Sequence, residues 1–324
     1  MRKIPLVIII LILLIILSIG GVLGWRIWQK SVGTNRITEN VSKESEKNEP
    51  IISDLNLKTA KLATLTDEVL SFFMPIVYFS PNGKHVAYVI TKNKEMKYFI
   101  GLDGNEIGPY EDIENIESGN FIKFSPDGQR FAYAVTKNQK SFLVLDGKDL
   151  GPYDGTGEFT FSPDSKRFAY TTRNRTATEY YLILDGKENG PYQSIEEGLI
   201  FSPDSQHLAY VASKSQKLTI VLDGKEIATY DESSGGFGSP DSFMLSIYKL
   251  TFSPDGKHIA YILGKYADKD KYSLILDGKE LISSEDREPE FIFSPDSKKF
   301  AYSYSSGSGG QLQNDYFLVL DGKK

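Results

Sequence analysis

The sequence predicts an all-β fold, a six-bladed β-propeller of four-stranded antiparallel blades, and three short motifs carry this prediction. The motifs Phe-Ser-Pro, Ala-Tyr and Leu-Asp-Gly each occur six times, in the same order along the chain. Neighbouring Phe-Ser-Pro triplets are 37 to 51 residues apart and begin at Phe79, Phe124, Phe161, Phe201, Phe252 and Phe293. A repeat of about 40 residues made of strand and turn signals is typical of propellers, in which each sheet covers its neighbour around an axis.

The second copy shows how one blade is assigned. Strand A ends at Phe124, and Ser125–Gly128 has the composition of a type I turn. Asp146-Gly147 is a signal for a tight hairpin between strands C and D. Pro152 fits strand D because D is the outer edge strand, where a missing N–H is tolerated. Strands B, C and D are therefore predicted at 131–135, 142–145 and 150–153.

Packing between blades should involve two of the recurring residues. The alanine of each Ala-Tyr pair is small because adjacent sheets approach there, and the phenylalanine of each Phe-Ser-Pro fills the space between blades. The sixth copy ends at Lys324 without a strand D, which would leave an unpaired edge. We expect a segment within residues 51–65 to supply this strand and close the ring. A truncated chain or an imperfectly closed ring is the competing interpretation.

The pattern FSPDGxxxAY followed by LDG resembles the WD-like repeats of TolB-type β-propellers. The resemblance covers about residues 76–324 and includes all six copies. It implies the propeller fold and frequent export in bacteria, and it implies no single activity, because propellers carry many functions. The chain has no counterpart of the N-terminal α/β domain of TolB, so the resemblance does not extend to a role in the Tol system.

An N-terminal transmembrane helix is predicted before the propeller. Ile4–Leu23 is an apolar run of about 30 Å if helical, and Trp25 and Trp28 follow it as interfacial anchors. A cleaved signal peptide is the alternative, but the run exceeds the usual apolar core of such peptides. Arg2 and Lys3 precede the run, whereas Arg26, Lys30 and Arg36 follow it, so a count of basic residues alone favours a cytoplasmic C-terminal side. A translocated tail of three residues is less common than a signal anchor, however, and the repeats resemble exported propellers. We expect a single-pass protein of the cell envelope, with a cytoplasmic N-terminus and an extracytoplasmic propeller, periplasmic or at the cell surface.

Three parts follow from this division. Residues 1–30 form the transmembrane signal anchor, 31–50 a flexible polar linker, and 51–324 the propeller. The blades are predicted to start near residues 76, 120, 158, 198, 248 and 290. The net charge of −6 argues against a nucleic-acid partner. The absence of cysteine excludes disulfides, thiolate metal sites and a cysteine nucleophile.

The recurring polar residues are interpreted as structural. A catalytic carboxylate would be needed once or twice, whereas the Ser-Pro-Asp turn, with Asn82 in place of aspartate in the first copy, recurs six times. The histidines His85, His207 and His258 occupy one repeat position that holds Arg130, Arg167 and Lys299 in the other copies. A position that accepts any basic residue is an exposed basic site rather than part of a catalytic triad or a metal site. We therefore predict no catalytic residue, no metal site and no cofactor.

Functional residues are expected on one face of the propeller. In an up-and-down sheet the A–B and C–D turns share one face, which is nearly invariant here, while the D–A and B–C loops share the other. Functional residues on rigid scaffolds concentrate in variable loops. The D–A loops, predicted at 111–119, 154–158, 193–198, 231–248 and 283–290, are strongly acidic, and the B–C loops are basic. This charge distribution is either mutual neutralisation or a docking surface.

The predicted binding residues lie in the D–A loops. The insertion 231–248 combines glycines with apolar residues, although Phe243–Tyr248 could instead lengthen strand A of the fifth blade. The complete set is Phe237, Phe243, Met244, Glu111, Asp112, Glu196, Glu197, Asp231 and Glu232.

Three functions remain open at this stage. The leading hypothesis is a non-catalytic binding or scaffolding module for a protein, peptide or glycan. The alternative is a carboxylate-dependent glycan hydrolase or lyase with acidic loops at the channel mouth, which would need two suitably spaced carboxylates. A structural or sensory stalk without a ligand is the third.

Overall fold

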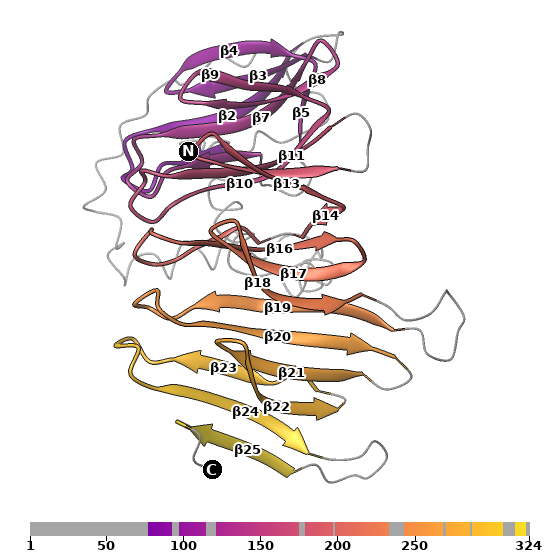
Figure 1. Cartoon of the computed structure of the whole chain (residues 1–324). Helices are drawn as coiled ribbons and strands as arrows, with labels where there is room; N and C mark the ends of the chain where they lie inside the picture. The colour runs from indigo at the N-terminus through magenta and orange to yellow at the C-terminus, as the bar shows by residue number, and fades with distance from the viewer. Residues whose placement is uncertain are drawn as a thin grey trace, which may run out of the picture. The chain divides into compact units, whose positions relative to one another are not determined.

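The computed structural model describes residues 77–92, 97–114, 121–174, 179–196, 198–232, 243–267, 270–285, 287–306 and 315–321. All of them belong to one compact unit, Leu62–Lys324. Every regular element in these ranges is a β-strand, and the strands form six antiparallel sheets that follow one another in chain order (Figure 1). The all-β prediction and the six sheets are confirmed.

Each of the first five sheets contains the predicted four-stranded A–B–C–D meander. The first sheet contains β1 (Val77–Phe79), β2 (Val86–Lys92), β3 (Lys97–Leu102) and β4 (Asn105–Tyr110). The second contains β5 (Asp112–Ile113), β6 (Ile122–Phe124), β7 (Phe131–Lys137), β8 (Lys140–Leu145) and β9 (Lys148–Tyr153). The third contains β10 (Gly155–Phe161), β11 (Phe168–Arg173), β12 (Tyr180–Leu184) and β13 (Lys187–Tyr192).

The remaining sheets repeat this order. The fourth contains β14 (Ser194–Ile195), β15 (Ile200–Phe201), β16 (Leu208–Lys214), β17 (Lys217–Leu222) and β18 (Lys225–Asp231). The fifth contains β19 (Met244–Phe252), β20 (Ile259–Tyr266), β21 (Lys271–Leu276) and β22 (Lys279–Glu285). The sixth contains three described strands, β23 (Glu290–Phe293), β24 (Phe300–Ser306) and β25 (Asp315–Leu320).

Strand A, the first strand of each sheet, is longer in several sheets than the sequence predicted. In the second and fourth sheets it is split into two pieces, β5 with β6 and β14 with β15, which pair with opposite ends of the same B strand. In the third and fifth sheets the pieces merge into β10 and β19, each with a register shift. Parts of the predicted D–A loops are therefore strand, because the long B strand needs backbone partners along its whole length.

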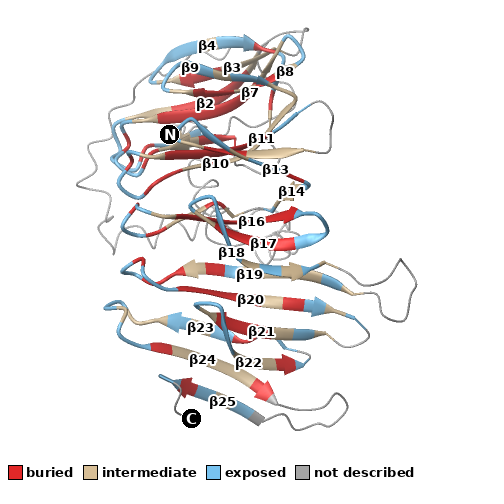
Figure 2. Cartoon of the chain, viewed as in Figure 1, coloured by how far each residue is buried: buried red, intermediate tan, exposed pale blue. Residues whose placement is uncertain are grey.

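Apolar contacts between successive sheets form the core. The cluster between the second and third sheets contains Ala132 and Leu143 from one sheet and Phe161 and Phe168 from the next. The alanine of each Ala-Tyr pair is fully buried in the first five copies: Ala87, Ala132, Ala169, Ala209 and Ala260. Buried residues accordingly concentrate on the central strands of the sheets (Figure 2). The predicted roles at the interfaces are confirmed for these five alanines and for Phe124, Phe161, Phe201, Phe252 and Phe293, which join the clusters, whereas Phe79 is exposed.

A pair of tyrosine hydroxyls joins each of the first four interfaces. The tyrosine of Ala-Tyr meets one from strand D of the preceding sheet at 2.7–2.9 Å, in the pairs Tyr110–Tyr133, Tyr153–Tyr170, Tyr192–Tyr210 and Tyr230–Tyr261. Burial, together with the hydrogen bond that Tyr210 shares with Tyr192, raises the pKa of Tyr210. These hydroxyls satisfy each other inside an otherwise apolar interface.

The two terminal sheets each leave an apolar face uncovered among the described residues. Leu318 in β25 is 71% exposed, whereas its counterparts Ile100, Leu143, Leu182, Ile220 and Leu274 are at most 1% exposed. Phe79 in β1 is 72% exposed, whereas Phe161 and Phe252 at the same repeat position are buried. The segment 51–65, predicted to close the ring, lies outside the described residues. So do the predicted transmembrane span and the polar linker. No helix long and apolar enough to cross a membrane occurs in the described ranges.

Removing residues 51–65 tests the predicted closing strand. A chain that starts at residue 66 should be less stable than one that starts at residue 51, because the free edge of β25 and the face around Leu318 would lose their cover. Burial of one leucine side chain contributes about 1.5–3 kcal/mol, so a loss of at least this size is expected in urea unfolding. Starting at residue 51 rather than 31 should change nothing. Equal stabilities of the chains from 51 and 66 would contradict the prediction.

Candidate binding surfaces

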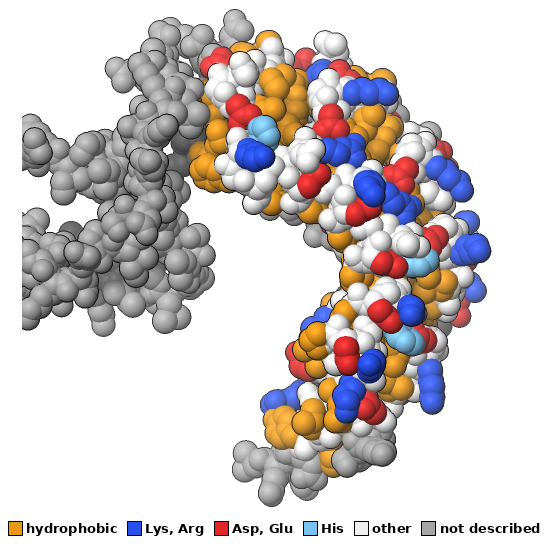
Figure 3. All heavy atoms as spheres, turned by 90° about the vertical axis from the view of Figure 1, so that its left-hand side faces the viewer, with side chains coloured by type: hydrophobic (Ala, Val, Ile, Leu, Met, Phe, Trp, Pro, Cys, Tyr) orange, Lys and Arg blue, Asp and Glu red, His pale blue; other side chains and the backbone are white. Residues whose placement is uncertain are grey.

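The ends of the strands define two surfaces. The turn face carries the Ser-Pro-Asp turns between strands A and B and the Leu-Asp-Gly turns between strands C and D. Acidic side chains on this face lie beside histidine, lysine and arginine side chains (Figure 3). The loop face carries the D–A and B–C connections, where the predicted binding residues lie.

Each Ser-Pro-Asp turn is closed by its own side chains. The Ser125 hydroxyl donates to Asp127 Oδ1 at 2.6 Å and accepts the N–H of Arg130 at 2.9 Å. The N–H of Gly128 donates to the carbonyl of Ser125 at 2.8 Å, as expected for a type I turn. The hydrogen bonds from Ser125 and from the N–H of Gln129 lower the pKa of Asp127. The corresponding serine hydroxyls lower the pKa of Asp164, Asp204, Asp255 and Asp296 as well.

The aspartate of Leu-Asp-Gly ties the two turns of a sheet together. Asp146 Oδ1 accepts the N–H of Phe131 at 2.9 Å, and Asp146 Oδ2 accepts Nε–H of Arg130 at 2.9 Å. Asp146 and Gly147 both have positive φ, which fits the predicted tight hairpin. We call this arrangement the aspartate clip.

The aspartate clip occurs in all six sheets. The carboxylate-to-base distances are 2.6–2.9 Å in five copies and 3.9 Å in the sixth, in the pairs His85–Asp103, Arg130–Asp146, Arg167–Asp185, His207–Asp223, His258–Asp277 and Lys299–Asp321. The repeat position that accepts histidine, arginine or lysine is therefore the cationic half of a structural pair. Among the described residues, no group of three or more histidine or acidic side chains could hold a metal ion.

Neighbouring turns are also joined between sheets. The N–H of Asp127 donates to the Ser165 hydroxyl of the next sheet at 2.9 Å, and the same bond joins Asp164 to Ser205 and Asp255 to Ser297. Arg167 Nη1 donates to the carbonyl of Gln206 at 2.6 Å, and its guanidinium lies over the Phe201 ring. The recurring polar side chains thus hold turns within a sheet and between adjacent sheets.

On the loop face, several predicted binding residues also make local bonds. The Glu111 carboxylate accepts the N–H groups of Asn138 and Gln139, which form the β7–β8 turn, at 3.1 and 2.9 Å. Asp231 is 3.4 Å from Lys217 Nζ, and Glu232 accepts the Ser213 hydroxyl. Of these contacts, only that of Asp231 with Lys217 pairs opposite charges, while Glu111 and Glu232 bond to uncharged groups.

Two other acidic residues of the predicted set are exposed. Asp112 Oδ1 accepts the N–H of Ile113 at 2.8 Å, and Glu196 accepts the Ser194 hydroxyl at 3.1 Å. Phe237 and Glu197 lie outside the described residues. The acidic part of the set is therefore distributed over the D–A connections of different sheets and does not converge on one described cavity.

Two of the three apolar residues of the predicted set, Phe243 and Met244, lie at the start of β19. Met244 begins this strand and is 64% exposed, and Lys265 Nζ lies 4.0 Å from the centre of the Phe243 ring. Residues 244–248 pair with β20, so the alternative in which this stretch lengthens strand A of the fifth sheet is confirmed from Met244 onward. Met244 thus presents an apolar side chain from a rigid strand end rather than from a loop.

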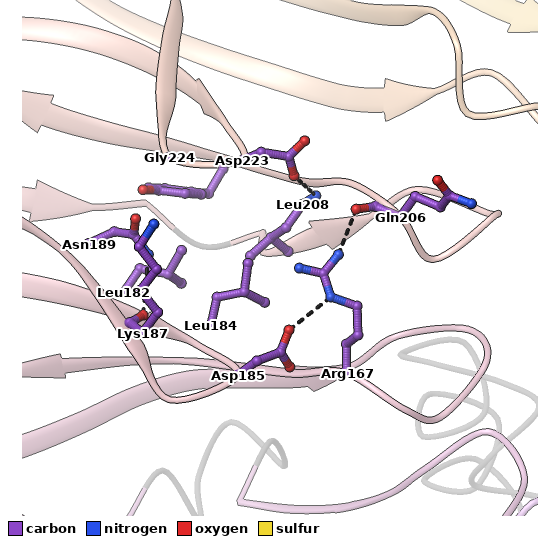
Figure 4. Close-up of a pocket in the computed structure, with 11 residues that line it drawn as sticks. Arg167, Leu182, Leu184, Asp185, Lys187, Asn189, Gln206, Leu208, Asp223 and Gly224 are labelled. Atoms are coloured by element: carbon purple, nitrogen blue, oxygen red, sulfur yellow. Dashed lines mark hydrogen bonds and ion pairs between the residues drawn. The ribbon is translucent and has the colours of Figure 1, made fainter.

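The sequence prediction missed a cleft on the turn face. It lies between the third and fourth sheets and has a volume of about 360 Å³. Leu182, Leu184, Leu208 and Tyr210 form its apolar lining, while the polar side chains Lys187, Asn189, Arg167, Asp185, Gln206 and Asp223 surround it (Figure 4). The signal that could have found it is Asn189, because the other described copies have isoleucine or leucine at this repeat position.

No family model matches the sequence, and no curated protein matches it. Solved structures similar to the chain include a protein assigned as TolB from Agrobacterium tumefaciens, with 16% identity over 65% of this chain and 80% of that one, at a TM-score of 0.33. The periplasmic gluconolactonase PpgL of Pseudomonas aeruginosa has 14% identity over 75% and 87%, at a TM-score of 0.36. The β-propeller domain of Myceliophteria thermophila Cps50 (Swd1) has 15% identity over 74% and 82%, at a TM-score of 0.34.

These neighbours include a protein assigned as TolB, an enzyme and a β-propeller domain that is described only by its fold. At such identities and TM-scores, none of their activities transfers to this chain.

Replacement of Ser125 by alanine tests the Ser-Pro-Asp turn. The change leaves the N–H of Arg130 without its acceptor and should lower the free energy of unfolding by about 1–2 kcal/mol at pH 7. The pKa of Asp127 is lower in the folded chain than its unfolded value of about 3.9. The ionised carboxylate therefore stabilises the fold above this pH, and that stabilisation is lost as the pH falls through the folded pKa. The variant should therefore show a weaker loss of stability below about pH 4 than the unchanged chain. Parallel acid unfolding curves would contradict this role.

Two changes in one aspartate clip test whether it is structural. Asp223→Ala removes the acceptor for the N–H of the buried Leu208 and should cost about 1–3 kcal/mol in urea unfolding. His207→Arg should be tolerated, because Arg130 and Arg167 fill the same position in other sheets. A His207→Arg variant as unstable as Asp223→Ala would show that histidine has a specific role there.

Proposed function

We propose that the chain is a membrane-tethered binding or scaffolding module that docks a protein or peptide on its loop face, outside the cytoplasm. The observation that carries this proposal is that the recurring polar residues are bonded within the turns, while a large apolar side chain specific to one copy is exposed. The recurring serines, aspartates and basic residues are bonded to one another in the turns, whereas the large exposed side chain of Met244 and its neighbour Phe243 have no counterpart in other copies.

The proposed contact patch consists of Phe243, Met244 and Lys265. Met244 supplies an adaptable apolar side chain, and Lys265 covers the Phe243 ring, which gives the patch a cationic rim. Asp112 and Glu196, on the connections of other sheets, extend the same face with exposed acidic groups. A partner with an apolar side chain flanked by charges of both signs would complement this surface.

The membrane tether and the location rest on the sequence. The apolar run Ile4–Leu23, the tryptophans that follow it and the polar segment 31–50 support a propeller held near the outer surface of the membrane. A mobile module of this kind suits docking, because a tether raises the local concentration of membrane-bound partners.

The alternative, a carboxylate-dependent glycan hydrolase or lyase, would require two carboxylates poised at one sugar. The described carboxylates Glu111, Asp231 and Glu232 accept hydrogen bonds or pair with lysine within the loops. This arrangement supports docking over bond cleavage.

Capture of partners from solubilised membranes tests the proposal, with the full chain in detergent as bait. Met244→Glu should weaken retention of any specific partner about tenfold, because a charge would replace an apolar contact at the centre of the patch. Phe243→Ala should weaken it in the same direction.

Lys257→Glu is the matched control, because Lys257 is an exposed residue of the turn face. It should leave retention unchanged. A partner that is retained by the Met244→Glu variant and lost by the Lys257→Glu variant would place the docking surface on the turn face and contradict the proposal.

A further inference from the structure

The interface between the third and fourth sheets departs from the repeat at two positions that face each other. In three other interfaces these positions hold an aliphatic and an aromatic side chain packed in one cluster: Ile107 with Phe131, Leu150 with Phe168, and Leu281 with Phe300. Ile227 and Ile259 occupy them at the fourth interface. Here the pair is Asn189 and Leu208, so this interface lacks the aromatic ring of the first, second and fifth interfaces and has a polar side chain where every other described copy has isoleucine or leucine.

A cleft of about 360 Å³ lies at these two positions, and both Asn189 and Leu208 line it. Its volume lies at the lower end of the range for small-molecule sites. Leu182 and Leu208 line it and are almost completely buried, which makes its inner surface apolar. Asn189 and Lys187 enter from β13 at one side, and Arg167 and Gln206 lie at the other (Figure 4).

Most of the charges around the cleft are already paired. Arg167 Nε donates to Asp185 at 2.9 Å. Asp223 Oδ2 is 2.6 Å from His207 Nδ1, and this contact pairs opposite charges only when His207 is protonated. The exposed Lys187 makes no ion pair with any residue that the structure describes. The Asn189 amide donates to the carbonyl of Lys187 at 3.3 Å and can donate a second hydrogen to a ligand. The cleft therefore combines an apolar lining with the ammonium group of Lys187 and an amide donor on one side.

We propose that this cleft is a binding site for a small amphipathic anion. The apolar body of the ligand, a ring system or a short acyl chain, packs against Leu182, Leu184 and Leu208. Its carboxylate or sulfonate accepts charge-assisted hydrogen bonds from Lys187 and a hydrogen bond from the Asn189 amide. The site lies on the turn face and is independent of the docking patch around Met244.

The repeat itself provides the decisive variant. Asn189→Leu with Leu208→Phe fills the cleft with the side chains that Leu150 and Phe168 place at the second interface. Because the neighbouring interface accommodates both, the filled variant should fold and should be at least as stable as the unchanged chain. The reciprocal variant, Leu150→Asn with Phe168→Leu, introduces the same departure at the second interface.

Binding can be measured by fluorine NMR with the full chain and a fluorinated naphthoate, an aromatic carboxylate of suitable size. The filled variant should bind the naphthoate at least about tenfold more weakly than the unchanged chain, and the reciprocal variant should gain a second site. All three proteins are measured in the same detergent, so partition of the naphthoate into micelles affects them equally. Equal binding by the filled variant and the unchanged chain would overturn the site.

Lys187→Gln tests the class of ligand, and it does not depend on the folding of the filled variant. The change should weaken the naphthoate about tenfold and leave the corresponding uncharged naphthyl alcohol unaffected. If Lys187→Gln weakens neither ligand, or both equally, the site is not an anion site and the proposal is wrong.

Discussion

The aspartate clip is the interaction on which the rest of the structure depends. One carboxylate, such as Asp146, accepts a backbone N–H at the start of strand B and pairs with the basic residue next to it. Because the carboxylate sits in the turn between strands C and D, the clip fixes that turn against the turn between strands A and B. The bond is short-range and local, so every copy of the repeat forms it independently. This explains why histidine, arginine and lysine are interchangeable as the cationic partner.

From this local unit, the interfaces between sheets follow. The clip and the Ser-Pro-Asp turn align the turn ends of each sheet, and the bond between Asp127 and Ser165 aligns one sheet with the next. Paired tyrosine hydroxyls and buried alanines then allow close approach of neighbouring sheets. The recurring polar side chains are thus bonded within and between the sheets. Function is therefore best sought where the repeat is broken, at Met244 on the loop face and at Asn189 on the turn face.

Features that depend on neighbouring residues could be predicted from the sequence, whereas contacts between distant segments could not. The turn at Ser125, the hairpin at Asp146 and the burial of Ala132 follow from short-range rules, and the structure confirms them. The extension of β19 to Met244 was left open, because a strand and an apolar loop share the same composition until a partner strand is known. The bonds of Glu111 to the β7–β8 turn were missed, because they join residues 27 and 28 positions apart.

The sequence by itself determined the repeat, the strand order within each sheet and the structural role of its recurring residues. This was possible because the same short-range contacts recur in all six copies. A residue that recurs in every copy is needed for the shape of the sheet rather than for one site. Only the tertiary structure decided which exposed side chains lie on a strand end and where the interfaces leave space. The cleft at Asn189 depends on the combined volume of side chains from two sheets, and the sequence indicates it only by an asparagine at a repeat position that is otherwise aliphatic.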